Sequence, residues 1–158
     1  DKGEIFLPQM IQAAETIKVA LNSIKDKLNA NIDNTNGTKG KIIIATVKGD
    51  IHDIGKNIVK IMLENYGYEV IDLGKDVPIE TVVETAKKQN IKLIGLSALM
   101  TTTVQNMKDT IQAIKDAGID AKVIVGGAVL TEEYAKKINA DYYAKDAKSS
   151  VEIAKLTF

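Results

Sequence analysis

The chain has 158 residues, of which 45% are hydrophobic and 27% are charged, so it can bury one main core and is too apolar to be disordered. Lysine plus arginine and aspartate plus glutamate each number 21, a balance that gives no basic surface for nucleic acid or an anionic membrane. The lack of cysteine excludes disulfides, thiolate metal sites and iron–sulfur clusters. No segment has the roughly 20 apolar residues that cross a bilayer, and we expect a cytoplasmic protein.

The first part of the chain has the pattern of one amphipathic helix. Between residues 5 and 28 the apolar side chains recur at the spacing of a single helical face. Residues 30–40 are rich in Asn, Thr and Gly and predict a linker. A lone helix cannot bury its face, so it must pack on the following domain or on helices outside this sequence. The start at Asp1, without an initiator methionine, indicates a piece of a longer polypeptide or a processed chain.

From residue 41 onward, short β-branched runs alternate with helical segments. The sequence predicts strands at 41–47, 68–73, 93–96, 122–125 and 141–144, and helices at 57–65, 79–89, 104–117, 132–138 and 147–156. This alternation is typical of an α/β fold with a parallel sheet and helices on both faces. Right-handed crossovers then favour a doubly wound, flavodoxin-like five-stranded sheet of order 2-1-3-4-5.

In such a sheet, ligands bind beyond the carboxyl ends of the strands where the order reverses, here between the first and third strands. The loops expected to contact a ligand are therefore residues 48–55 and 97–103. The first carries the only histidine of the chain, His52. Its glycines, Gly49 and Gly55, are too few for a loop that wraps a phosphate, so a dinucleotide or Walker-type site is not expected.

Two interpretations of His52 remain open at this point. It can be a structural histidine, with Asp50 or Asp53 capping the following helix. Alternatively it ligates a metal while a carboxylate holds its other nitrogen. One protein ligand holds a bare ion poorly, so such a metal would arrive inside a macrocycle.

The loops after the third and fourth strands also contain residues that suit a ligand. Four hydroxyls lie between residues 97 and 103, more than helix capping requires. After the fourth strand, Gly126 and Gly127 leave space for a flat group, although turns also use glycine.

These pieces together resemble the three-part signature of cobalamin-binding domains. They are Asp50-x-His52-x-x-Gly55, then 41 intervening residues, Ser97-x-Leu99, then 26 intervening residues, and Gly126-Gly127. The resemblance runs from about residue 40 to the end of the chain. It agrees with the fold predicted from periodicity and implies cobalamin, as methylcobalamin, for the cofactor.

The resemblance also implies roles for individual residues. The nucleotide tail of cobalamin would leave cobalt and enter a slot in the sheet domain, and His52 would become the lower cobalt ligand. Asp50 would hydrogen-bond to His52, and Thr103, where the family often has serine, would continue this relay. The other positions that match cofactor contacts are Ile51, Asp53, Ile54, Gly55, Ser97, Leu99, Thr101, Gly126, Gly127, Ala128 and Ala147.

Residues 3–16 are similar to the end of the helical cap that precedes the cobalamin domain of methionine synthase. In this interpretation residues 1–29 are the end of the cap, 30–40 the linker and 41–158 the cobalamin-binding domain. Phe6, Leu7 and Met10 match cap contacts with the upper face of the corrin, or are ordinary helix core.

We therefore expect the corrinoid domain of a methionine synthase, which carries a methyl group from methyltetrahydrofolate to homocysteine. Its partners would be folate- and homocysteine-binding methyltransferase domains, and it would not turn over alone. The alternative is the cognate corrinoid protein of a methylamine, methanol or aryl-ether methyltransferase system, since those proteins share the cap and the signature.

Two other classes fit less well. Coenzyme-dependent mutases carry the Asp-x-His-x-x-Gly loop but usually lack this cap. Response-regulator receivers share the strand order but need an aspartate at the end of the third strand, where this chain has Leu96-Ser97.

Overall fold

The structure is a computed structural model and describes residues 16–17, 19–20 and 38–158. The chain divides into two units, residues 1–36 and 37–158. In the first unit, the four described residues are helical and exposed, inside the helix predicted there. Phe6, Leu7, Met10 and the rest of the predicted cap lie outside the described residues. The domain boundaries 1–29, 30–40 and 41–158 therefore stay a prediction.

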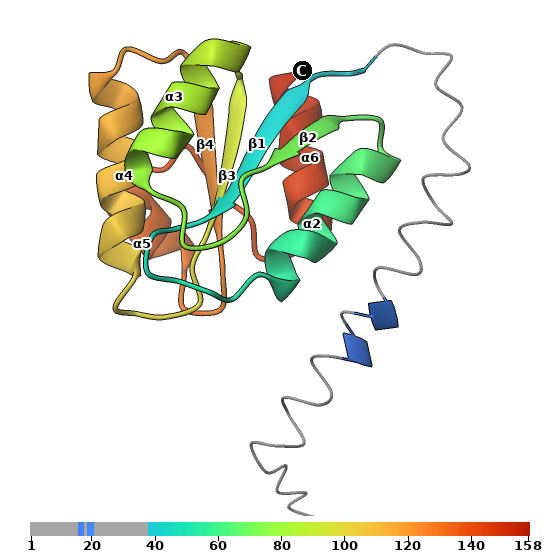
Figure 1. The fold of residues 1–158 in the computed structure, drawn as a ribbon, viewed down its shortest axis with the longest axis horizontal. Coiled ribbons are helices and arrows are strands. Elements are labelled where there is room, and N and C mark those ends of the chain that lie inside the picture. Colours follow the sequence, from blue (N-terminus) through green and yellow to red (C-terminus); the bar gives the residue numbers. More distant parts are fainter. Residues whose placement is uncertain (1–15, 18, 21–37) are drawn as a thin grey trace, which may run out of the picture. The chain divides into compact units, whose positions relative to one another are not determined.

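The second unit is built on a five-stranded sheet. The strands are β1 (Lys41–Thr46), β2 (Glu69–Asp72), β3 (Leu93–Ser97), β4 (Lys122–Gly126) and β5 (Tyr142–Tyr143). They pair in parallel in the order β2-β1-β3-β4-β5, which confirms the predicted doubly wound fold (Figure 1). β1 lies between β2 and β3 and is apolar on both faces, because Ile42, Ile43, Ile44 and Ala45 are all buried.

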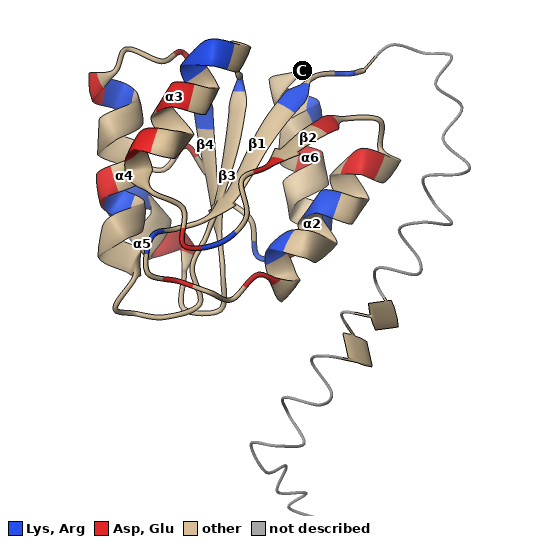
Figure 2. Cartoon of the chain, in the orientation of Figure 1, with Lys and Arg blue, Asp and Glu red and all other residues tan. Residues whose placement is uncertain are grey.

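Five helices cover the sheet. They are α2 (Ile54–Asn65), α3 (Ile79–Gln89), α4 (Val104–Asp116), α5 (Glu132–Lys137) and α6 (Ala147–Thr157). α2 and α6 pack together on one face, and α3, α4 and α5 cover the other (Figure 1). Lysine and acidic side chains are interspersed along these helices (Figure 2). None of the helices in the described part of the chain is both long enough and apolar enough to cross a bilayer.

The observed helices and strands lie within one residue of the predicted bounds, except for one helix start. α2 begins at Ile54, not at residue 57, and so takes in Gly55 and Lys56. The prediction was wrong there because glycine and lysine give no apolar signal, whereas in the fold Lys56 is buried by an ion pair.

The alternation of side chains along the strands divides the core into two clusters. Ile43 and Ala45 of β1 belong to a large cluster with Met107, Ile111 and other residues of α3, α4 and α5. On the α2 and α6 face the buried cluster is smaller: Ile42, Ile44, Leu63, Tyr68, Leu93, Ile124, Ala144, Val151 and Ala154. Most of these residues come from the amino-terminal halves of the strands and from the facing parts of α2 and α6. The same face is hollow toward the carboxyl ends of the strands, and this hollow positions the site.

Candidate cofactor site at the carboxyl end of the sheet

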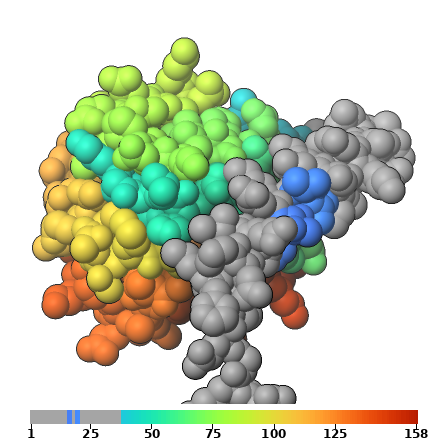
Figure 3. Space-filling view, turned by 60° about the horizontal axis from the view of Figure 1, so that its bottom comes forward, coloured from blue at the N-terminus to red at the C-terminus, as the bar shows by residue number. Residues whose placement is uncertain are grey.

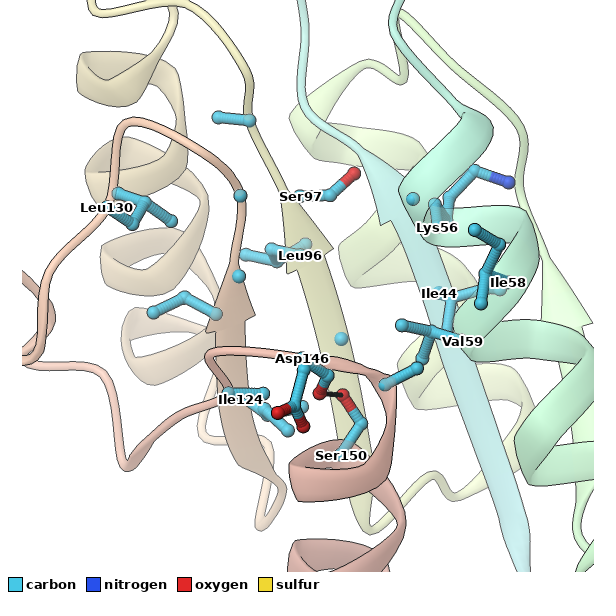
Figure 4. A pocket seen from close by; sticks show the side chains of 18 of the residues that line it. Ile44, Lys56, Ile58, Val59, Leu96, Ser97, Ile124, Leu130, Asp146 and Ser150 are labelled. Carbon is cyan, nitrogen blue, oxygen red and sulfur yellow. Dashed lines mark hydrogen bonds between the residues drawn. The ribbon is translucent and has the colours of Figure 1, made fainter. Parts of the chain in front are cut away.

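A cavity of about 790 Å³ lies between α2, the start of α6 and the carboxyl ends of β1, β3 and β4. In Figure 4, Ile58 and Val59 of α2 line one side, Leu130 lies at the opposite side, and Ser150 of α6 lies at the bottom. The floor is open because β3 has a glycine, Gly95, at its centre. A Cβ atom there would lie 3.3 Å from the Ile44 Cγ2 atom. A glycine inside a strand is typical of a place where a ligand approaches the backbone.

Two more glycines shape the cavity after β4. Gly126 and Gly127 both line it. Gly127 has φ +140°, and a Cβ atom on it would lie 1.8 Å from the Ala98 carbonyl oxygen. A Cβ on Gly126 would lie 3.1 Å from the Ala144 carbonyl oxygen. These glycines therefore allow three backbone segments to meet at the cavity, in addition to leaving the space that the sequence predicts.

The loops after β1 and β3 meet through Asp50 and His52. The Nδ1 atom of His52 lies 2.8 Å from Asp50 Oδ1, and the backbone N–H of His52 donates to the same oxygen at 3.0 Å. The Asp50 side chain is fully buried, whereas 44% of the His52 side chain is exposed at the lining of the cavity. Since the carboxylate engages Nδ1, Nε2 is the ring nitrogen that can bind a metal.

The second oxygen of Asp50 is held by the β3–α4 loop. Asp50 Oδ2 accepts the backbone N–H groups of Leu99 at 2.7 Å and Met100 at 3.2 Å, and the Thr103 hydroxyl at 2.9 Å. Burial by itself raises the pKa of Asp50, but the hydrogen bonds from His52, Leu99 and Thr103 outweigh it and bring the pKa well below its ordinary value of 3.8. Asp50 is therefore an anion at neutral pH that can hold a proton on His52 Nδ1.

This geometry argues against the capping interpretation of the same residues. Asp53 is the N-cap residue of α2 and Thr103 that of α4, yet neither side chain accepts a helix N–H. The Thr103 hydroxyl instead contacts Asp50 and the Met100 carbonyl oxygen. The predicted chain from His52 through Asp50 to Thr103 is thus present as direct hydrogen bonds.

Most of the predicted contact residues surround the cavity. Those that line it are Ile51, His52, Asp53, Ile54, Gly55, Ser97, Leu99, Gly126, Gly127, Ala128 and Ala147. Asp50 and Thr103 are buried behind this lining. Thr101, in contrast, is exposed on a turn and is not among the lining residues. The contacts of these residues with a cofactor remain predictions.

The loops that carry these residues come from separate parts of the chain. Figure 3 brings this end of the molecule forward, and the segments after β1, β3 and β4, in teal, yellow and orange, lie next to one another. Hydrogen bonds join Leu99 to Asp50 and Ala98 to Gly126. Ser97 at the end of β3 places its hydroxyl 2.9 Å from that of Thr46, at the wall of the cavity.

Sequence reasoning missed Lys56, which also lines the cavity. Its side chain is only 3% exposed, and its Nζ atom lies 2.6 Å from Asp72 Oδ1. Burial raises the pKa of Asp72, but bonds from Lys56 and the Gly74 N–H lower it to below its ordinary value. A lysine in a first helical turn is usually exposed, so no pattern in the sequence indicates this ion pair. Gly95 was also missed, although a glycine inside a β-branched run was a usable signal.

The chain is similar to proteins whose names point to one cofactor. Residues 40–152 match the family model of the B12 binding domain. The chain is 43% identical to dimethylamine corrinoid protein 3 of Methanosarcina mazei, over 98% of this chain and 93% of that protein. It is 45% identical to dimethylamine corrinoid protein 2 of Methanosarcina acetivorans, over 98% and 72% respectively.

Solved structures agree with these relatives. The monomethylamine corrinoid protein of Methanosarcina barkeri has a TM-score of 0.86 and 33% identity, over 98% of this chain and 73% of that one. The methanol:cobalamin methyltransferase complex of the same species has a TM-score of 0.74 and 33% identity, over 99% and 59%. A receiver domain from Mycobacterium tuberculosis, at 14% identity and a TM-score of 0.55, shares the fold alone.

The methionine synthase prediction is wrong, and with it the assignment to methionine biosynthesis. The curated relatives are dimethylamine and trimethylamine corrinoid proteins, which favours the alternative. The residues that favoured methionine synthase belong to the predicted cap and to the loop after β4, where contacts with the corrinoid itself are predicted. A resemblance at residues predicted to contact the cofactor does not by itself identify the methyl donor or acceptor. The cavity, the pairing of exposed His52 with buried Asp50 and the match over residues 40–152 lead to one conclusion: the chain belongs to the family of B12-binding domains, and its cofactor is cobalamin.

Proposed function

We propose that the chain is the corrinoid carrier protein of a methylamine methyltransferase system, and that it binds cobalamin through His52 with the nucleotide tail in the cavity. The observation that carries this proposal is the exposed imidazole of His52 on a buried carboxylate at the mouth of an apolar cavity. When bound, the corrinoid supplies a cobalt centre that accepts a methyl group and passes it on.

The cavity suits a flat aromatic base. Its volume of about 790 Å³ falls in the range of about 300–1,000 Å³ that is usual for small-molecule sites. Ile44, Val59 and Ile124 supply apolar walls, and Gly95 leaves the floor without a side chain. The Ser97 hydroxyl offers a polar contact for a ring nitrogen. The residues that line the cavity therefore fit the nucleotide tail of cobalamin, the cofactor that the family implies.

The chain controls the ligand nitrogen through Asp50. The carboxylate fixes the ring orientation and keeps a proton on Nδ1, which raises the basicity of Nε2. Asp50 is held in turn by two backbone N–H groups and the Thr103 hydroxyl, so the ring cannot swing without breaking this network. If Nε2 binds or releases a metal, the strength with which Nδ1 holds its proton would therefore change.

The rim of the cavity suits a large apolar face. Ile51, Ile58 and Leu99 line the cavity and keep large exposed fractions. Exposed aliphatic groups of this size are uncommon at one place unless they bind something. We propose that they pack against the lower face of the macrocycle.

The proposed partner is a separate methyltransferase that acts on a methylamine. The relatives at 43–45% identity are named for dimethylamine, and a structure related at 33% identity is that of a methanol:cobalamin methyltransferase complex. These similarities support a carrier that visits a partner, with dimethylamine as the first substrate to test.

The experiment is a methylation assay with the purified chain. It is loaded with hydroxocobalamin, reduced, and mixed in turn with dimethylamine, trimethylamine, monomethylamine and methanol methyltransferases and their substrates. We expect the visible spectrum of the bound cobalamin to change to that of the methylated cofactor with a methylamine enzyme, and not with His52→Ala. Methylation by the methanol enzyme alone, or by none of the four, would overturn the proposal.

A further inference from the structure

The β2–α3 loop touches the histidine loop at two points through a single residue, Asp76. The backbone N–H of Gly49 donates to Asp76 Oδ1 at 2.6 Å. The backbone N–H of Asp76 donates to the carbonyl oxygen of Asp50 at 2.9 Å. One residue thus holds both ends of the Gly49–Asp50 segment, which leads directly into His52.

Asp76 cannot shift easily, because its own loop is tied to β1. The N–H of Thr46 donates to the Gly74 carbonyl at 3.0 Å, and that of Val77 donates to the Thr46 carbonyl at 3.1 Å. Val47 and Val77 also form a parallel β-bridge. The loop therefore lies alongside the end of β1 and presents Asp76 to the next residues of the chain.

The backbone at Asp76 is unusual. Its φ is +52°, and that of Gly49 opposite it is +81°. A positive φ is uncommon for a residue with a side chain, although Asp and Asn tolerate it better than most. This conformation lets one residue direct both its N–H and its carboxylate at the histidine loop. The strain is stored beside the site, where such strain commonly has a function.

We propose that Asp76 is a positioning residue for the cobalt ligand: it fixes the backbone of Gly49 and Asp50 so that the Asp50 carboxylate reaches His52 and the β3–α4 loop at once. The inference rests on the proposed function in that His52 is taken as the ligand. The Asp50 oxygens must meet His52 Nδ1 and Leu99 N–H at 2.8 and 2.7 Å. A small rotation of the peptide unit ahead of Asp50 would lengthen one of these bonds.

Three variants separate the carboxylate from the backbone. Asp76→Gly keeps the positive φ and the N–H but removes the carboxylate. Asp76→Asn keeps an acceptor oxygen and tolerates the same φ. The control is Asn90→Gly, because Asn90 has φ +48° and lies at the C-cap of α3, at the opposite end of the sheet. A general effect of added backbone freedom would appear in Asp76→Gly and Asn90→Gly alike.

The first measurements use the chain without cofactor. Amide hydrogen exchange reports local opening, and we expect the Gly49 amide to exchange about ten-fold faster or more in Asp76→Gly, with changes of about two-fold or less in Asp76→Asn and Asn90→Gly. His52 is the only histidine, so its imidazole NMR signals are identified without assignment. They should shift in Asp76→Gly alone.

The second measurement is the binding of methylcobalamin to the same variants. We expect Asp76→Gly to bind at least about ten-fold more weakly than Asp76→Asn, a loss equivalent to about 1.4 kcal/mol. Failure of the wild type to bind would overturn the cofactor proposal and leave the role of Asp76 to be decided by the exchange and imidazole data. Unchanged Gly49 exchange and unchanged His52 signals in Asp76→Gly would overturn the role of Asp76.

A wild-type measurement covers the case in which Asp76→Gly does not fold. A scalar coupling across the hydrogen bond, between the Gly49 amide nitrogen and the Asp76 carboxyl carbon, would establish the contact directly. A Gly49 amide that exchanges as fast as an unprotected one in the wild type would contradict the proposal.

Discussion

The two faces of the sheet are held together in different ways. On the face covered by α3, α4 and α5, large side chains such as Met107, Ile111 and Ile114 are almost fully buried in one large cluster. On the face covered by α2 and α6, a smaller cluster of buried side chains packs beside a cavity of about 790 Å³. The closed face supplies stability, and the open face gives up part of its core to hold a ligand.

On the open face, strands and loops are held together mainly by backbone contacts. Glycines at 95, 126 and 127 bring strands and loops close without side chains, and the Asp50 carboxylate ties two loops together through backbone N–H groups. A substitution on the closed face should therefore change stability, and one on the open face should change binding, except where backbones touch.

The largest effect is expected where backbones touch. In Gly127→Ala the new Cβ would lie 1.8 Å from the Ala98 carbonyl oxygen, so the β4–α5 and β3–α4 loops must separate. We expect a loss of about 4 kcal/mol or more in the free energy of unfolding, measured with urea.

Gly118→Ala is the matched control for that substitution. Gly118 also has a positive φ, of +64°, but no atom lies within 4 Å of its added Cβ. The free energy of unfolding of Gly118→Ala should fall by only about 1 kcal/mol. Similar losses in the two variants would show that the conformation of Gly127, and not the close approach, matters.

On the closed face, Ile111→Ala should lower the free energy of unfolding by about 2–5 kcal/mol, because it empties a well-packed site. The same truncation on the open face, Ile58→Ala, should cost about 0.5 kcal/mol or less, since Ile58 is 38% exposed. Methylcobalamin binding should follow the reverse order, with Ile58→Ala weakened and folded Ile111→Ala unchanged. Equal losses of stability in the two variants would contradict the difference between the closed and the open face.

Filling the floor of the cavity tests its role directly. Gly95→Leu should stay folded with a loss of about 1–3 kcal/mol, because its side chain extends into the cavity, and it should no longer retain methylcobalamin on a desalting column. Gly95→Ala adds only a Cβ, 3.3 Å from Ile44 Cγ2, which a shift of the Ile44 side chain by a few tenths of an ångström accommodates, and it should still bind. Retention of the cofactor by Gly95→Leu would place the ligand elsewhere.

The smallest expected effect is on the stability of the chain at low pH. The pKa of Asp72 in the folded chain lies below its ordinary value of 3.8 because the bonds from Lys56 and Gly74 outweigh burial. Its contribution to stability is therefore present at neutral pH and lost as the pH falls below that value. Asp72→Asn should show a shallower decline in the urea midpoint than the wild type between about pH 5 and pH 2. Parallel declines would mean that Asp72 contributes nothing.

The sequence predicted the fold well because its signals were local. The apolar run at Ile42, Ile43 and Ile44 and the alternating helical patterns are strong at the level of single elements. The same holds for the loop that carries Asp50 and His52, which follows the first strand at the point where the strand order reverses. Residues adjacent in sequence to a recognisable motif were therefore found.

The rest of the site depends on contacts between distant segments. Asp76 reaches Gly49 from the β2–α3 loop, and Lys56 is buried only because Asp72 lies opposite it. Neither contact leaves a trace in local composition. Thr101 illustrates the reverse case, since it lies among the predicted hydroxyls of its loop but the turn exposes it. The choice of partner was the least predictable feature, because the residues predicted to contact the corrinoid do not identify the methyl donor.

The most direct test of the account uses one histidine and one cofactor. The purified chain and its His52→Ala variant are mixed with methylcobalamin, freed of unbound ligand and compared by visible spectroscopy. We expect the wild type to retain the cofactor, with the spectrum of a form whose own base has been displaced by an imidazole, and we expect His52→Ala to lack this spectrum. A correctly folded wild type that retains no cobalamin, or a spectrum unchanged by His52→Ala, would contradict this expectation.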